Sequence, residues 1–260
     1  MPQDAVTMDR DGAVATIRLN RPHKRNALNG EMWRLLMELV EAADNDVEVK
    51  VIVVTGEGGA FAAGADIEEF GPAMTDSAAG EVARDITYRA QMGLRRAAKP
   101  TLAKIRGACV GGGCGIALAC DLRFADTSAR FGIPAGKLGL IYTVADTKRL
   151  VDVVGQARAK DMLYTGRIFG ASEAHDYGLV DWLLVPADLD KAVADYAAQI
   201  CEASQFSARA AKGIIHAILD GVTDDTPETR TLFVEAFKGV DFKEGRAAFL
   251  EKRRAMFKFQ

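Results

Sequence analysis

The chain has 260 residues, of which 49% are hydrophobic and 27% charged, a composition typical of globular proteins that excludes a disordered or collagen-like chain. The 33 Lys and Arg residues are balanced by 36 Asp and Glu residues, without a basic stripe, so we expect no nucleic-acid partner. The longest nearly apolar stretch, residues 108–120, contains four glycines and is too short to cross a bilayer, so we expect no membrane segment.

The N-terminus and the cysteines indicate the compartment. The start, MPQDAVTMDRDG, contains acids and lacks the basic region and apolar run of a signal peptide. The four cysteines, Cys109, Cys114, Cys120 and Cys201, fit neither a zinc pattern nor the disulfide framework of a small secreted domain. We therefore expect a cytoplasmic protein with buried free thiols and no metal site.

The first half of the chain alternates strands and helices. The residues at 49–55 are β-branched and almost continuously apolar, which predicts a central strand buried on both faces. The predicted elements in chain order are a strand at 13–19, a helix at 30–44, strand 49–55, a helix at 80–98, a strand at 101–105, a helix at 114–120 and a strand at 122–125.

The second half is mostly helical. The pattern predicts helices at 144–154, 156–163, 172–178, 188–201, 207–219 and 227–238, with a strand at 179–185. This order indicates an α/β core over residues 1–203 and a C-terminal helical region over residues 204–260.

Two segments share one design, in which a buried strand leads through a glycine-rich turn into the start of a helix. They are GEGGAFAAGAD at 56–66 and GACVGGGCGIAL at 107–118. Free N–H groups at a helix N-terminus can hold an oxyanion, and two such turns could grip one oxygen atom. The alternative is that the glycines only allow strands and helices to pack closely.

A dinucleotide site is a competing interpretation of these turns. GGGCG lacks the GxGxxG spacing, lies in the middle of the chain, and has no acid about 20 residues further on at a strand end. The Lys-Ser pair of a phosphate-binding Walker loop is also missing. Nucleotide binding is therefore poorly supported.

Four runs resemble the enoyl-CoA hydratase/isomerase (crotonase) superfamily. They are NRPHKRNALN at 20–29, AFAAGADIEEF at 60–70, KPTLAKIRGACVGGGCGIALACDLRFA at 99–125 and AFLEKRRAMF at 248–257. The resemblance implies an α/β fold with a crotonase-like spiral core of ββα units and a helical C-terminal trimerisation region. It also implies an acyl-CoA thioester substrate, no cofactor beyond the CoA moiety, and a homotrimer or a dimer of trimers.

The resemblance further implies which residues bind the substrate. The N–H groups of Ala65 and Gly112 would bind the thioester oxygen, where preorganised donors stabilise the negative charge of an enolate. Residues at CoA-contacting positions are Lys24, Arg25, Ala27, Ala63, Gly64, Asp66, Ile67 and Gly111. Lys24 and Arg25 could instead form a solvated turn, and Asp66 could be a helix cap.

The chain departs from the family pattern at the acids. Typical hydratases carry two glutamates that share a water molecule, and these positions are Gly115 and Ala135 here. Because acid–base groups contribute roughly 10² to 10⁴ in rate, we expect a poor hydratase of the ordinary kind. The residues that would stabilise an enolate remain.

Other groups could act in place of the glutamates. Tyr142 resembles the position of a tyrosine in the methylmalonyl-CoA decarboxylase branch, which suggests a decarboxylase or another lyase; it could equally be a pocket wall. Asp146 and Glu68 are further candidate acids, although Asp146 could cap a helix beginning near Thr147. Cys114 follows the glycines but lacks a basic partner, so we expect a packed thiol.

A catalytically silent acyl-CoA-binding protein is the remaining alternative. The helices after Ser204 are expected to bury apolar side chains between subunits, among them Leu232, Phe233, Phe237, Phe249 and Phe257. Residues between Gly71 and Gln91 would line the acyl pocket. They are the least family-like part of the chain, so the sequence does not identify the acyl group.

Overall fold

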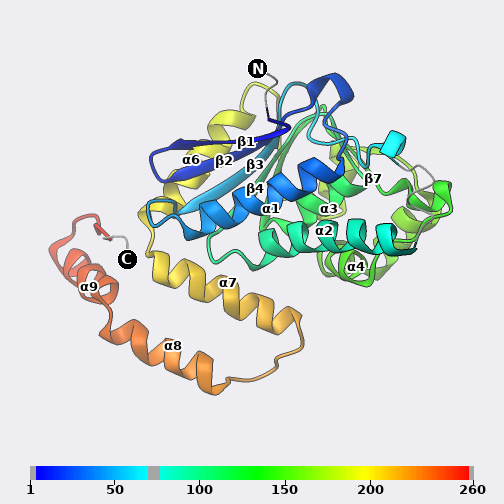
Figure 1. Ribbon diagram of the computed structural model, residues 1–260. Helices are drawn as coiled ribbons and strands as arrows, with labels where there is room; N and C mark the ends of the chain where they lie inside the picture. Colours follow the sequence, from blue (N-terminus) through cyan, green and yellow to red (C-terminus); the bar gives the residue numbers. More distant parts are fainter. Residues whose placement is uncertain (1–3, 70–76, 258–260) are drawn as a thin grey trace.

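A six-stranded sheet lies at the centre of the protein. The computed structural model describes residues 4–69 and 77–257 (Figure 1). The strand order is β1-β2-β3-β4-β6-β9, in which β1 and β2 are antiparallel and the remaining neighbours are parallel. The strands are β1 (Val6–Asp11), β2 (Val14–Leu19), β3 (Val51–Gly56), β4 (Thr101–Ile105), β6 (Leu122–Asp126) and β9 (Trp182–Leu184).

A small second sheet stands beside the first. It has the order β5-β7-β8, with β5 (Ala108–Val110) parallel to β7 (Arg130–Gly132) and β7 antiparallel to β8 (Phe169–Gly170). An isolated bridge between Ala62 and Cys109 joins β5 to the loop that follows β3. The loops after β3 and β4 are therefore held side by side.

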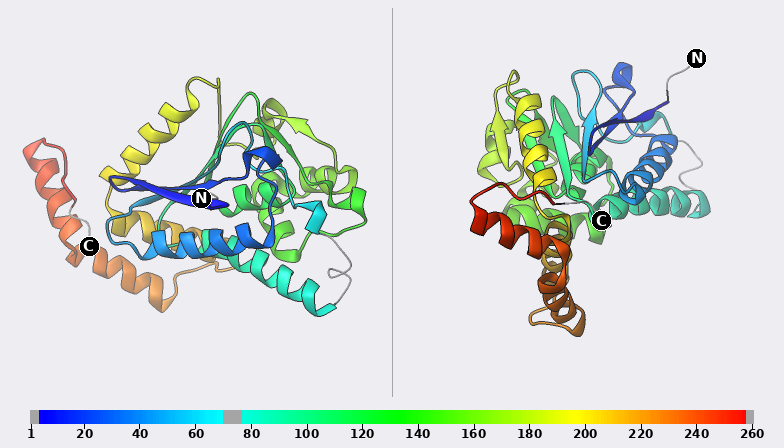
Figure 2. Two further views of the ribbon diagram at one scale, coloured as in Figure 1. Left: turned by 45° about the horizontal axis from the view of Figure 1, so that its top comes forward. Right: turned by 90° about the vertical axis from the view of Figure 1, so that its left-hand side faces the viewer.

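Helices cover both faces of the large sheet. The α-helices are α1 (Gly30–Asn45), α2 (Ser77–Arg96), α3 (Gly112–Ala119), α4 (Val144–Thr165), α5 (Ala171–Asp176), α6 (Leu189–Glu202), α7 (Gln205–Leu219), α8 (Pro227–Lys238) and α9 (Val240–Glu251). The 3-10 helices within residues 4–69 and 77–257 are η1 (Pro22–Lys24), η2 (Ile67–Glu69) and η4 (Pro134–Leu138). Figure 2 shows α1 and α6 on opposite faces of the sheet.

The predicted central strand is confirmed as β3. Ile52 and Val54 pack into the larger core cluster, and Val51 and Val53 pack into the cluster on the α6 face. Successive side chains of a strand point to opposite faces, so a strand covered by helices on both sides needs a continuous apolar run.

Several predicted boundaries differ from the structure. The strand at 13–19 is present as β2, but β1 was not predicted, because this edge strand buries only Val6 and carries polar side chains. The predicted strand 179–185 is paired only over Trp182–Leu184. The two helices predicted at 144–154 and 156–163 are confirmed as the two parts of α4, since Gly155 between them is non-helical, with φ 72° and ψ 163°.

The difference at α3 affects the site. We predicted a helix from Cys114, whereas α3 begins at Gly112. Glycine has a low helix propensity, so the pattern alone places the start too late. Gly112 is thus the first helical residue, where backbone N–H groups have no partner within the helix.

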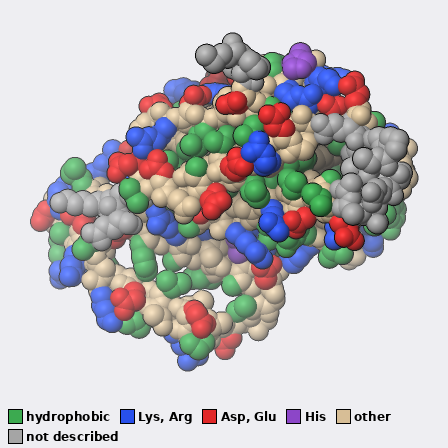
Figure 3. Space-filling view, in the orientation of Figure 1, with side chains coloured by type: hydrophobic (Ala, Val, Ile, Leu, Met, Phe, Trp, Pro, Cys, Tyr) green, Lys and Arg blue, Asp and Glu red, His purple; other side chains and the backbone are tan. Residues whose placement is uncertain are grey.

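The C-terminal helices carry many exposed apolar side chains. Helices α8 and α9 extend away from the sheet (Figure 1), and hydrophobic side chains gather on this region around its openings (Figure 3). Phe233 is 67% exposed and Phe249 is 84% exposed. The division at residue 203 and the burial of this region between subunits stay predictions.

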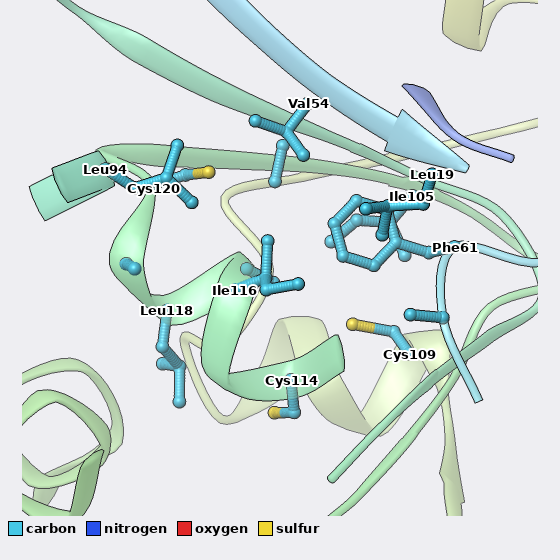
Figure 4. Close-up of a cluster of buried hydrophobic side chains, with 14 of the residues drawn as sticks. Leu19, Val54, Phe61, Leu94, Ile105, Cys109, Cys114, Ile116, Leu118 and Cys120 are labelled. Atoms are coloured by element: carbon cyan, nitrogen blue, oxygen red, sulfur yellow. The ribbon is translucent and has the colours of Figure 1, made fainter. Parts of the chain in front are cut away.

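The thiols belong to the core. Figure 4 shows Cys109, Cys114 and Cys120 among apolar side chains such as Ile116. All four cysteines are free; these three are buried and Cys201 is half-buried. Over residues 4–69 and 77–257, no helix combines the length and apolarity needed to cross a membrane.

Candidate active site

Two glycine-containing turns meet at the carboxyl end of the parallel strands. One follows β3 and ends at Gly64, and the other follows β5 and ends at Gly111. A Cβ atom built on Gly111 would lie 3.7 Å from the Gly64 Cα atom, so the two turns are in contact. Both glycines have positive φ, 102° at Gly64 and 54° at Gly111, which favours residues without a Cβ atom.

The next residue of each turn presents an unused N–H group. In the described part of the chain, neither the Ala65 nor the Gly112 N–H donates a hydrogen bond, whereas the flanking Asp66 N–H binds the Leu28 carbonyl at 2.8 Å. At the start of α3, the first internal bond comes from Gly115, which donates to Gly111 at 3.0 Å. Two free donors therefore stand on adjoining turns, and Gly112 also lies at the positive end of a helix.

Both donors border one pocket of about 380 Å³. The lining comes from α1, the two turns, α2 and the segment before α4. It comprises Leu28, Asn29, Gly30, Trp33, Ala65, Asp66, Gly80, Ala83, Arg84, Ile86, Thr87, Tyr88, Gly112, Ile141, Tyr142, Thr143 and Asp146. Four of the residues expected to act in catalysis, Ala65, Gly112, Tyr142 and Asp146, are thus brought together, and residues 80–88 supply the α2 wall expected from that region; residues 70–76 lie outside the described part.

The residues expected to contact CoA divide into two groups. Ala63, Gly64 and Gly111 belong to the two touching turns, and Asp66 lines the pocket. Lys24, Arg25, Ala27 and Ile67 do not line it. They lie in the neighbouring loop that includes η1, or at the start of η2, where Ile67 is 59% exposed.

Asp66 fastens these loops together. Its carboxylate accepts hydrogen bonds from Arg21 at 2.9 Å and from Lys24 at 3.3 Å, and only 7% of its side chain is exposed. The hydrogen bond from Arg21, supported by Lys24, lowers the pKa of Asp66 against the opposing effect of desolvation. Lys24 also pairs with Glu68 at 2.6 Å, so the predicted solvated turn is an ion-paired one.

Asn26 fixes the loop that includes η1 through side-chain hydrogen bonds, and the sequence analysis did not identify it. Its side chain accepts from the Arg21 N–H at 2.8 Å and donates to the carbonyls of Glu57 and Ala60 at 3.0 and 2.7 Å. Asn26 adopts a positive φ of 56°, which Asn tolerates better than most residues. The sequence signal that could have identified this residue is an Asn in a turn that begins with Pro22.

Asp146 is part of a buried ion pair. Its carboxylate accepts a hydrogen bond from Arg149, whose guanidinium also donates to the Gln91 carboxamide oxygen. The suggestion that Asp146 caps a helix near Thr147 is wrong. Helix α4 starts at Val144, and the Thr143 hydroxyl is the cap, accepting from the Asp146 N–H at 3.1 Å.

Tyr142 reaches the second turn. Its hydroxyl donates to the Gly111 carbonyl oxygen at 3.2 Å. Burial raises the pKa of Tyr142 well above its ordinary value, with smaller contributions from Cys114 and Asp146. The phenol is therefore a proton donor and not a base at neutral pH.

Other candidate groups lie outside this constellation. Burial raises the pKa of the Cys114 thiol to about 12, which agrees with a packed thiol. Glu68 is exposed and does not line the pocket. In residues 4–69 and 77–257, no three His, Cys, Asp or Glu side chains are grouped as metal ligands.

Comparison with known proteins places this arrangement in a family. The profile described as enoyl-CoA hydratase/isomerase matches residues 9–260. The chain belongs to the enoyl-CoA hydratase/isomerase family. It is 33% identical over 265 residues to the crotonyl-CoA hydratase of Syntrophomonas wolfei, with 99% of each chain covered.

Solved structures of the family have the same fold. An enoyl-CoA hydratase/isomerase family protein from Hyphomonas neptunium matches with a TM-score of 0.96 and 43% identity, covering 98% of both chains. An enoyl-CoA hydratase/carnithine racemase from Magnetospirillum magneticum matches with a TM-score of 0.95 and 34% identity, covering 100% of this chain and 97% of that one. The predicted crotonase-like α/β fold is confirmed.

The position of the first missing family glutamate is filled from another helix. A Cβ atom on Gly115 would lie 2.6 Å from the Gln91 Nε2 atom and 3.2 Å from the Tyr142 hydroxyl. Gln91 of α2 and Tyr142 thus pack against the place where a side chain of residue 115 would begin. The sequence analysis identified neither Gln91 nor Arg149 as a site residue. Gln91 acts through contacts distant in sequence, whereas the Arg149–Asp146 pair has the i,i+3 spacing of one helix face, which was an available signal.

The second position, Ala135, lies in η4. Ala135 packs against the main core and is not part of the pocket lining. Its methyl group offers no acid or base. The carboxylate and phenol side chains of the pocket lining are Asp66, Tyr88, Tyr142 and Asp146, of which the last two lie at the start of α4.

Proposed function

We propose that the protein binds an acyl-CoA thioester and stabilises its enolate through the N–H groups of Ala65 and Gly112. One observation carries this proposal: two N–H groups, neither with an acceptor among the described residues, border the same pocket from two turns in contact. A thioester oxygen placed between them would accept both hydrogen bonds. Its negative charge grows as the α-carbon loses a proton or a carboxylate, so these bonds strengthen along the reaction.

The proposed donors are preorganised by the fold. Gly112 is fixed at the N-terminus of α3, and Ala65 follows Gly64, whose carbonyl accepts from the Leu28 N–H at 2.7 Å. Fixed donors need no reorientation when charge develops, and loss of one such donor typically costs about 3 kcal/mol of transition-state stabilisation.

CoA would lie along the turns and the neighbouring η1 loop. The residues proposed to contact or position it are Lys24, Arg25, Ala27, Ala63, Gly64, Asp66, Ile67 and Gly111. Asp66 would act by holding Arg21 and Lys24 in place, since its carboxylate is engaged with both. The chemistry proposed here uses no cofactor beyond the CoA moiety.

The missing glutamates favour a reaction other than ordinary hydration. In a decarboxylation, the bond between the α-carbon and a substrate carboxylate breaks, carbon dioxide leaves, and the electron pair moves into the thioester as an enolate. The enolate carbon then takes a proton. Tyr142, a donor that lines the pocket, is the proposed source, and Asp146 the nearby acid.

The assembly proposed for the family-like C-terminal region is a homotrimer or a dimer of trimers. The exposed aromatic side chains support association, because Phe233 and Phe249 would otherwise leave large apolar areas in water.

Proton exchange tests the proposal most directly. We expect deuterium from heavy water to enter the α-carbon of at least one saturated acyl-CoA, detected by mass spectrometry. A panel of enoyl-, malonyl- and methylmalonyl-CoA would then separate hydratase from decarboxylase activity. Tight binding of these thioesters without exchange or turnover would instead establish the alternative, a catalytically silent acyl-CoA-binding protein.

A further inference from the structure

Helix α2 brings a cation to the pocket. The α2 residues in the lining are Gly80, Ala83, Arg84, Ile86, Thr87 and Tyr88. Residues three or four apart share one helix face, so Gly80, Arg84 and Thr87 form a stripe along the pocket. This stripe continues to Gln91, whose Nε2 atom adjoins Gly115 and Tyr142.

Arg84 differs from the other charged residues of the lining. The carboxylates of Asp66 and Asp146 are paired, the first with Arg21 and Lys24 and the second with Arg149. Within the described residues, Arg84 makes no ion pair or hydrogen bond. Its guanidinium is permanently charged. The described lining therefore has one positive charge that is paired with no carboxylate of residues 4–69 and 77–257.

The position of Arg84 separates it from the proposed reacting centre. It lies seven residues before Gln91, which corresponds to about 10 Å along a helix axis. Gln91 marks the end of the stripe near Gly115, and exposed Arg84 stands towards the outer end. A group bound by Arg84 would belong to a part of the substrate several bonds from the thioester.

We propose that Arg84 selects acyl groups that carry a carboxylate at the end remote from the thioester. A guanidinium forms two parallel charge-assisted hydrogen bonds with a carboxylate, and a methyl group cannot replace them. This inference rests on the proposed function, since it takes the thioester to lie between Ala65 and Gly112. It names the substrate class, the CoA monothioesters of dicarboxylic acids.

The phosphates of CoA are a less suitable partner for Arg84. The cations expected to meet CoA, Lys24 and Arg25, lie at the end of η1 or directly after it, near the top of Figure 1, whereas α2 runs across the middle of the molecule. Lys24 is held by Asp66 on one part of the pocket lining, whereas Arg84 stands on the part that α2 supplies. A carboxylate on the acyl group fits the α2 side better.

Binding measurements on the purified full chain test this assignment. The ligands are adipyl-CoA and hexanoyl-CoA, which have the same chain length and differ by the terminal carboxylate, with titration calorimetry as the readout. We expect the wild type to favour adipyl-CoA and Arg84→Ala to reduce that preference at least about tenfold. Arg84→Lys should keep part of this preference, because lysine retains the positive charge but cannot form the bidentate hydrogen bonds of a guanidinium.

Arg89→Ala is the matched control. Arg89 lies on the same helix, pairs with Asp85 at 2.8 Å and does not line the pocket, so this variant should keep the wild-type preference. The assignment is overturned if the wild type shows no preference, or if Arg84→Ala weakens both ligands equally, which would indicate a CoA phosphate contact or a general structural effect.

The proposed function can fail separately. Deuterium exchange into hexanoyl-CoA tests enolate formation without involving a terminal carboxylate. Selective binding of adipyl-CoA with no exchange into either ligand would support the Arg84 assignment and contradict the enolate. Deuterium exchange without selective binding of adipyl-CoA would support the enolate and contradict the Arg84 assignment. A wild type that binds neither ligand would overturn both the assignment and the proposed function.

Discussion

The Tyr142 hydroxyl donates to the carbonyl oxygen of Gly111, the residue directly before the free N–H of Gly112. This bond ties the segment leading into α4 to one of the two turns proposed to hold the thioester oxygen. The phenol can therefore either steady the turn or, by turning its hydroxyl towards the substrate, deliver a proton. The two roles differ in what they predict.

Tyr142→Phe separates these roles. If Tyr142 donates the proton to the enolate carbon, kcat should fall by roughly 10² to 10⁴ with whichever acyl-CoA the wild type turns over, while KM changes little. If it only steadies the turn, the loss should be confined to about 1 kcal/mol of unfolding free energy. Steady-state kinetics and urea denaturation on the same preparation give both quantities, and unchanged turnover would leave Tyr142 as a pocket wall.

Ala65→Pro tests the proposed oxygen site, because proline has no N–H group. The Ala65 N–H has no acceptor among the described residues, so its removal breaks no internal hydrogen bond. We expect deuterium exchange to slow by about 10² to 10³. Ala65→Gly retains the N–H and is the control; circular dichroism checks that both variants fold. Equal rates in the wild type and a folded Ala65→Pro variant would contradict the oxygen site.

Gly115 and Gln91 should be energetically coupled. An added Cβ at Gly115 would come within 2.6 Å of the Gln91 Nε2 atom, so Gly115→Ala should cost about 1 to 3 kcal/mol of unfolding free energy. Gln91→Ala removes the obstacle. We expect the double variant in urea denaturation to be less destabilised than the sum of the single variants; simple additivity would mean that the two residues do not compete for this space.

Asp66 should make stability depend on pH in the acid range. Its pKa is lowered in the folded protein, chiefly by the Arg21 hydrogen bond, from an ordinary value of 3.8. The unfolded chain then binds the proton more readily, so this stabilisation is complete above the ordinary pKa and is lost as the pH falls through the folded value. Urea denaturation between about pH 5 and pH 2.5 should show that the unfolding free energy falls less with decreasing pH in Asp66→Asn than in the wild type. Parallel curves would contradict this role.

The exposed aromatic side chains of α8 and α9 should control assembly. In sedimentation velocity we expect the wild type to be a trimer or a larger multiple of three, and Phe233→Glu with Phe249→Glu to shift it towards the monomer. Lys238→Gln is the control, since this exposed α8 side chain pairs, among the residues that the structure describes, with Glu235 of its own helix alone. A monomeric wild type would refute the assembly.

Sequence patterns were enough to predict the elements in which burial or a break in the helix is visible in the residue types themselves. β3 was recognised because both of its faces are buried, and the break in α4 because Gly155 interrupts the helical pattern. β1 was missed because an edge strand with polar side chains has little apolar periodicity. The start of α3 was placed two residues late because its first turn is made of glycines.

The sequence by itself determined the family, the two glycine turns and the absence of acids at Gly115 and Ala135, since all of these are matters of residue type and local order. Only the tertiary structure decided that the turns touch, that Gln91 adjoins Gly115, that Arg149 binds Gln91, and that Arg84 is left without a carboxylate partner in the described chain. Packing of helices on the sheet brings together residues tens of positions apart, and spacing along the chain contains no information about that distance.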